Sequence, residues 1–64
     1  MKYYYHTEIG NLNGYFRYWV VAENAREAAS EALKLHNSKG RSILDGYVIK
    51  VADKFNYVKT FHIK

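Results

Sequence analysis

The sequence predicts a small α+β fold, in which an antiparallel sheet carries one helix on one of its faces. Alternating aromatic and β-branched segments lie at both ends of the chain, and one capped amphipathic segment separates them. The expected order is strand, strand, helix, strand, strand. The sheet would have four strands, or five if a short extra strand forms near Ile43. With 64 residues the chain is expected to form a single domain, 1–64.

The first two strands are predicted over Tyr3–Ile9 and over Tyr15–Ala22, with Glu23 as the alternative end of the second. Both segments are rich in residues that favour strands, and neither contains proline. Residues 10–14 between them read Gly-Asn-Leu-Asn-Gly. Because glycine and asparagine tolerate positive φ angles, this stretch predicts a five-residue hairpin loop.

A helix is predicted after Asn24, whose side chain can accept a hydrogen bond from the amide of Glu27. The helix-forming residues run out over residues 36–40, where the last residue is a glycine. Steps of about 100° per residue place the apolar residues in one arc, so the helix is amphipathic. Because most of that arc is alanine, the helix should lie close to the sheet. The arc contains Ala25, Ala28, Ala29, Ala32, Leu33, Leu35 and His36.

Two more strands are predicted, over Tyr47–Ala52 and over Phe55–Ile63, with a turn at Asp53 and Lys54. The Asp45-Gly46 pair between apolar residues is typical of a short hairpin. The same pair also fits a bulge that leads into the strand from Tyr47.

The two faces of the sheet are assigned from the helix. Because the chain passes from Ala22 into the helix, alternate residues before Ala22 are expected to face the helix. A slip of one residue in register would exchange the faces. The helix side is expected to carry Tyr3, Tyr5, Thr7, Ile9, Phe16, Tyr18, Val20, Ala22, Tyr47, Ile49, Val51, Phe55, Tyr57, Phe61 and Ile63. The opposite face is expected to carry Tyr4, His6, Glu8, Tyr15, Arg17, Trp19, Val21, Val48, Lys50, Asn56, Val58, Thr60 and His62.

The size of the chain favours association. A domain of this length buries only about 60% of the surface that its unfolded chain exposes, so its stability is marginal. The chain has no cysteine and therefore no disulfide framework. A homodimer would add buried area, and we expect one. No apolar run predicts a membrane-spanning helix, and residues 1–8 lack the apolar core of a secretory signal. We expect a cytoplasmic protein with no membrane partner.

The positive charge lies in the second half of the chain. Residues 1–33 carry three basic against four acidic residues, and residues 34–64 carry seven against two, for a net charge of +4. A basic half attracts polyanions and acidic surfaces. Lysine on edge strands also protects against aggregation, and the sequence leaves both interpretations open.

The segment Val20–Leu33 contains a strand that ends in Val-x-Ala, followed by Asn-x-x-Glu-Ala and an alanine-rich helix. It resembles a unit of small phage and plasmid proteins of the DpnD/PcfM-like family. The resemblance implies a mobile-element setting and a β-β-α-β core. It implies no chemistry, because the matching residues are structural. It does not extend to the aromatic outward face or to the last strand.

Nothing in the sequence predicts catalysis, a metal or a cofactor. The serines have no base placed to activate them, and the carboxylates are scattered. His6 and His62 are expected on the outward face, whereas His36 lies in the helix arc, so the three histidines do not converge on an ion. We expect His36 to bind carbonyl groups at the helix end. The protein is not expected to be an enzyme.

The outward face of the second strand is the most informative feature. A small antiparallel sheet usually packs one face on the core and exposes a polar face to water. Here the face expected to be exposed carries the single tryptophan beside an arginine. Such residues are typical of protein-binding hot spots, and aromatic rings with basic neighbours also stack nucleic-acid bases. We therefore expect a non-enzymatic accessory protein of phage or mobile-element type. It would bind, and by hypothesis inhibit, a host or defence protein complex.

Two alternatives are a direct nucleic-acid-binding module, for single strands or a duplex backbone, and a purely structural homodimer. The residues expected to contact the partner are Tyr4, Tyr15, Arg17, Trp19, Lys39, Arg41, Lys50, Lys59 and His62.

Overall fold

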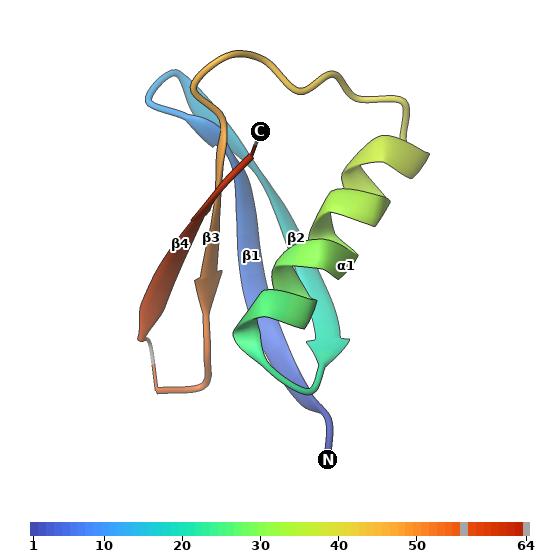
Figure 1. Ribbon diagram of the computed structural model, residues 1–64, viewed down its shortest axis with the longest axis vertical. Helices are drawn as coiled ribbons and strands as arrows, with labels where there is room; N and C mark the ends of the chain where they lie inside the picture. Colours follow the sequence, from blue (N-terminus) through green and yellow to red (C-terminus); the bar gives the residue numbers. More distant parts are fainter. Residues whose placement is uncertain (56, 64) are drawn as a thin grey trace.

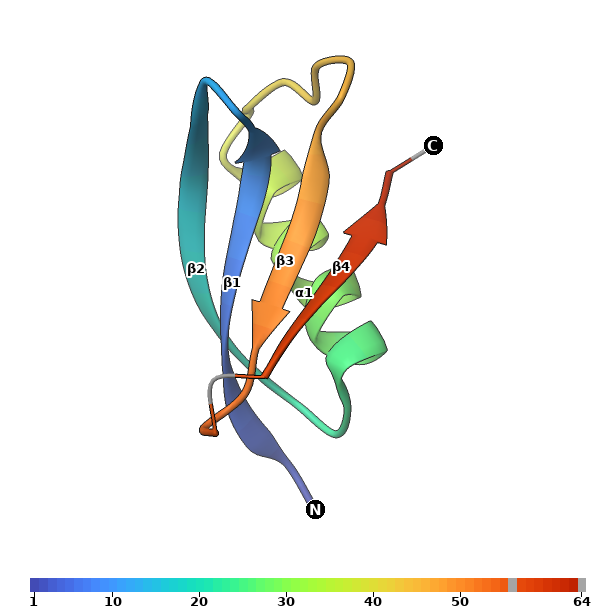
Figure 2. The same cartoon turned by 90° about the vertical axis from the view of Figure 1, so that its left-hand side faces the viewer.

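The computed structural model describes residues 1–55 and 57–63, and it contains a four-stranded antiparallel sheet with one helix on one face (Figure 1). The order along the chain is β1 (Tyr3–Asn11), β2 (Gly14–Ala22), α1 (Ala25–Ser38), β3 (Val48–Ala52) and β4 (Val58–His62). Across the sheet the order is β2-β1-β3-β4. Figure 2 shows β2 and β4 at the two edges, with α1 behind the sheet. The predicted class and element order are confirmed, and no strand forms near Ile43 in the part of the chain that the structure describes.

The first hairpin is tighter than predicted. β1 and β2 pair along their whole length, so the connection is a two-residue turn of Leu12 and Asn13 and not a five-residue loop. The Asn13 amide donates to Oδ1 of Asn11 at 2.9 Å, which closes the turn. Gly10 belongs to β1, and a Cβ there would lie 2.1 Å from the carbonyl oxygen of Gly14. The close approach of the two strands therefore requires a glycine.

The start of α1 is the predicted one. Asn24 is extended, and its Oδ1 accepts the amide of Glu27 at 2.8 Å. This bond satisfies one of the amides that a helix leaves unpaired in its first turn.

Replacing Asn24 with alanine should lower the free energy of unfolding by roughly 0.5–2 kcal/mol, because the Glu27 amide loses its acceptor. Urea unfolding followed by circular dichroism measures the loss. Asn24→Ser is the matched control, since serine keeps an acceptor oxygen and should remain close to the parent protein. Equal losses in both variants would contradict this cap.

The end of α1 is a glycine-terminated motif. Gly40 has a φ of 71°, and its amide donates to the carbonyl oxygen of Asn37 at 3.0 Å. The next amide, that of Arg41, donates to the carbonyl oxygen of His36 at 3.3 Å. These paired bonds are those of a Schellman ending, and they direct the chain sharply away from the helix axis.

The core lies between α1 and the helix side of the sheet. The alternation predicted for the two faces is confirmed in β1, β2 and β3. Tyr3 and Phe16, near strand ends on the helix side, are partly exposed, and so is Leu35 in the helix arc. Besides Gly10, the buried residues described are Tyr5, Thr7, Ile9, Tyr18, Val20, Ala22, Ile49 and Val51 from the sheet, and Ala28, Ala29, Ala32 and His36 from the helix.

The prediction for the last strand was wrong at its beginning. Phe55 and Tyr57 were expected in the core, but they are 67% and 73% exposed. The amides of both residues donate to Oδ1 of Asp53, at 2.8 and 3.1 Å. This local turn delays β4 to Val58, so the two rings precede the strand and remain largely exposed. Asn56, expected on the outward face, lies outside the described residues.

The Asp45-Gly46 pair forms a turn and not a hairpin. Gly46 has a φ of 83°, and the Tyr47 amide donates to the carbonyl oxygen of Leu44 at 3.2 Å. The turn leads directly into β3, one residue later than predicted. Within the described residues, the structure has no helix with the length and apolar character needed to cross a membrane.

Candidate interaction surface

The sheet surface opposite α1, called here the outer face, is built from rows of residues that face one another across the strands. Because all neighbouring strands are antiparallel, each row brings together residues far apart in the sequence. The rows are Val21–Tyr4, Trp19–His6–Ala52–Val58, Arg17–Glu8–Lys50–Thr60 and Tyr15–Gly10–Val48–His62.

One end of the outer face is aromatic and open. Trp19 is 69% exposed and Tyr4 is 71% exposed, although both project from a hydrogen-bonded sheet. The imidazole of His6 packs on the Trp19 indole, with ring centroids 4.9 Å apart. A depression of about 360 Å³ lies beside these rings and extends to Ala52 and Lys54. This end therefore combines a large exposed apolar surface with an adjoining hollow.

The next row is charged. Nε of Arg17 donates to Oε2 of Glu8 at 3.0 Å, and the arginine side chain remains mostly exposed. Such an exposed pair contributes at most about 1 kcal/mol to stability. Lys50 lies on the other side of Glu8, and its Nζ is 4.8 Å from the centroid of the Tyr15 ring. The ion pair and the cation–π contact give each of these long side chains a neighbour on the sheet surface.

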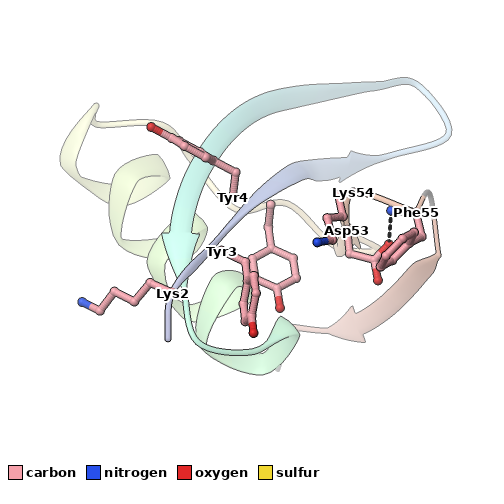
Figure 3. Close-up of a pocket in the computed structure, with 7 residues that line it drawn as sticks. Lys2, Tyr3, Tyr4, Asp53, Lys54 and Phe55 are labelled. Carbon is pink, nitrogen blue, oxygen red and sulfur yellow. Dashed lines mark hydrogen bonds between the residues drawn. The ribbon is translucent and has the colours of Figure 1, made fainter.

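A groove of about 600 Å³ adjoins the aromatic end (Figure 3). β1 begins at Tyr3, but among the described residues β3 pairs with it only from His6 onward, which leaves the start of β1 open on that side. Figure 3 shows Tyr3 and Tyr4 on opposite sides of the strand. This groove was not predicted from the sequence, because Phe55 was assigned to the core. The tendency of Asp53 to form a turn could have indicated that Phe55 lies outside the strand. Its lining residues are Lys2, Tyr3, Tyr4, Tyr5, Asp53, Lys54 and Phe55.

Only some of the residues expected to contact a partner lie on the outer face. Lys59 faces Val51, which is buried beneath the helix, so Lys59 lies on the helix side. Lys39 and Arg41 follow the end of α1. The basic second half of the chain is therefore not gathered into one patch. The expected residues that do share the outer face are Tyr4, Tyr15, Arg17, Trp19, Lys50 and His62.

Arg41 belongs to a second cluster of side chains, which lies on the helix side of the sheet. His36 is fully buried, and its Nε2 lies 2.8 Å from the Ser42 carbonyl oxygen. Because a carbonyl only accepts, Nε2–H donates there, and Nδ1 accepts from the Tyr18 hydroxyl at 2.8 Å. The Arg41 guanidinium donates to the same hydroxyl at 2.8 Å and lies 4.5 Å from the centroid of the Phe16 ring. Arg41 thus holds the loop after α1 against the sheet, and His36 binds a carbonyl beyond the helix.

The histidines remain apart. His6 and His62 both lie on the outer face, but β3 separates their strands. Within residues 1–55 and 57–63, no three histidine or carboxylate side chains converge as a metal ion would require.

The fold and the outer face together define a small α+β protein with an exposed sheet surface that is aromatic at one end and charged in the middle. No protein-family model, curated protein or solved structure matches the chain.

Proposed function

We propose that the protein acts without catalysis, by binding another protein through the outer face. The observation that carries the proposal is the exposure of Trp19 and Tyr4 on a hydrogen-bonded sheet, beside a hollow that extends to Lys54. The few residues that dominate the binding energy at protein interfaces are enriched in tryptophan, tyrosine and arginine. The contacts of His6 with Trp19 and of Glu8 with Arg17 reduce the side-chain entropy that binding would remove.

The charge distribution favours a protein over a nucleic acid. A platform for single strands needs open rings along a groove of positive charge. On the outer face Glu8 lies between Arg17 and Lys50, and Lys50 approaches the ring of Tyr15. A surface of mixed charge with an apolar end instead suits the rim and anchor of a protein interface.

In this proposal the protein is the product of a phage or another mobile element, and it binds and inhibits a host or defence complex. The assignment to a mobile element rests on the resemblance carried by Val20–Leu33. The net charge of +4 disfavours inhibition by mimicry of DNA, which would need an acidic chain. A basic binder can instead cover an acidic surface of the complex.

Trp19→Ala and Arg17→Glu should each weaken partner binding by at least about 2 kcal/mol while the fold survives. Both side chains are exposed and lie opposite the helix, so the core should not respond. The tagged protein would capture its partner from a nuclease-treated bacterial lysate, and calorimetry with the purified partner would measure the affinities. Tyr57→Ala is the matched control, because it removes an exposed ring that lies off the outer face.

Two results would overturn the proposal. Capture that disappears with nuclease, together with a steep fall of oligonucleotide affinity as salt rises, would favour the nucleic-acid alternative. A folded Trp19→Ala protein that binds its partner as tightly as the parent would remove the outer face as the binding surface.

A further inference from the structure

The free edge of β2 carries backbone groups that the function proposed above does not use. β2 ends the sheet, and among the described residues Figure 2 shows no helix or strand beside its outer edge. The strand is nine residues long and pairs with β1 without a bulge. An uncovered strand of this kind presents backbone groups that can pair with another chain.

The direction of the free backbone groups follows from the hairpin. In a two-residue hairpin the closing residues, Asn11 and Gly14, form a hydrogen-bonded pair. Along an antiparallel ladder, such pairs alternate with pairs of residues whose backbone groups do not bond to each other and point away from the partner strand. The carbonyl of Tyr18 accordingly points toward β1, where it also accepts the hydroxyl of Thr7 at 2.8 Å. The amides and carbonyls that point outward are those of Tyr15, Arg17, Trp19 and Val21.

The two edges of the sheet are not equally protected. Edge strands are commonly blunted by short length, by lysine, by proline or by bulges. β4 has five residues, including Lys59, whereas the longer β2 has no lysine, proline or bulge. Its single charge belongs to Arg17, whose guanidinium is already paired with Glu8. β2 is therefore the edge open to pairing.

The outward-pointing residues are arranged symmetrically about Tyr18. Consider β2 paired antiparallel with β2 of a second copy, with the two Tyr18 residues opposite each other. Arg17 of one copy then lies opposite Trp19 of the other, and Tyr15 lies opposite Val21. Because the arrangement has two-fold symmetry, each of these pairs occurs twice. Every outward-pointing amide and carbonyl then has a partner. A register centred on Arg17 would instead place two arginines opposite each other, which is destabilising.

We propose that the protein forms a homodimer through the β2 edge in this register, giving one continuous sheet across both copies. Arg17 of each copy then lies beside the indole of Trp19 of the other, where a guanidinium and an aromatic ring attract each other. Because a domain of this size leaves much of its surface exposed, the shared sheet adds burial that one copy lacks.

The test uses two variants at one exposed position. In the proposed register Trp19→Glu places a carboxylate opposite Arg17 of the second copy, whereas Trp19→Lys places two cations there. Sedimentation equilibrium should show a dimer for the parent and for Trp19→Glu, and a dimer at least about tenfold weaker for Trp19→Lys. Val58→Lys is the matched control, because it gives the protein the same net charge as Trp19→Lys but changes a residue on β4. It should associate as strongly as the parent.

Amide exchange measured by NMR provides an independent readout. The amides of Tyr15, Arg17, Trp19 and Val21 should become protected as concentration rises. The proposal is overturned by a parent protein that stays monomeric at millimolar concentration, by equal association of Trp19→Glu and Trp19→Lys, or by unprotected β2 amides in the dimer.

Discussion

Replacing His36 with alanine should reduce the free energy of unfolding by about 3–5 kcal/mol, since it combines a buried cavity with the loss of buried hydrogen bonds. The ring is fully buried and contacts both Tyr18 and Ser42. A chain of 64 residues has a total stability of only about 3–10 kcal/mol. The variant is therefore expected to be largely unfolded or to melt far below the parent protein.

The reason for so large an effect is that His36 joins three parts of the fold. It comes from α1, its Nδ1 accepts from Tyr18 on β2, and its Nε2–H donates to the loop after the helix. Without the imidazole, the Ser42 carbonyl loses its donor and the Tyr18 hydroxyl loses its acceptor. Arg41, which donates to that hydroxyl, would then be held less firmly.

Thermal and urea unfolding measure this loss, and Leu35→Ala is the matched control. Leu35 precedes His36 in the same helix but is partly exposed, so its truncation should have a much smaller effect. Tyr18→Phe should destabilise by roughly 1–3 kcal/mol, because it removes only the shared hydroxyl. If His36→Ala loses no more than Leu35→Ala, the cluster does not stabilise the fold.

Replacing Ala32 with leucine should destabilise the protein by about 1–3 kcal/mol, because the added atoms have no space. Ala28 and Ala32 have no exposed surface, and Ala29 is buried as well, so α1 lies directly against the sheet. A larger side chain would force the helix away from Val20, Ile49 and their neighbours in the core.

Ser30→Leu is the control for this substitution. It places the same side chain on the exposed side of the same helix, where no overpacking can occur. Urea unfolding of both variants should show a loss for Ala32→Leu alone. A stability of Ala32→Leu equal to that of Ser30→Leu would show that α1 does not lie as close to the sheet as its alanines indicate.

Much of the outer face could be predicted, because its residues follow from strand alternation. Tyr15, Arg17, Lys50 and Trp19 lie on that face as expected. Which of them touch one another could not be predicted. The contacts of Trp19 with His6 and of Arg17 with Glu8 arise from the register of β1 with β2, which the two-residue turn sets.

The sequence by itself determined the element order, the alternation of the faces and both ends of the helix, because these depend on residues within a few positions of one another. The Asn24 cap and the Gly40 ending are such local features. Only the tertiary structure decided that Arg41 is engaged with Tyr18, that Lys59 shares a side with the buried Val51, and which edge of the sheet is left open. These outcomes depend on strand pairing and packing between distant segments, which local patterns do not specify.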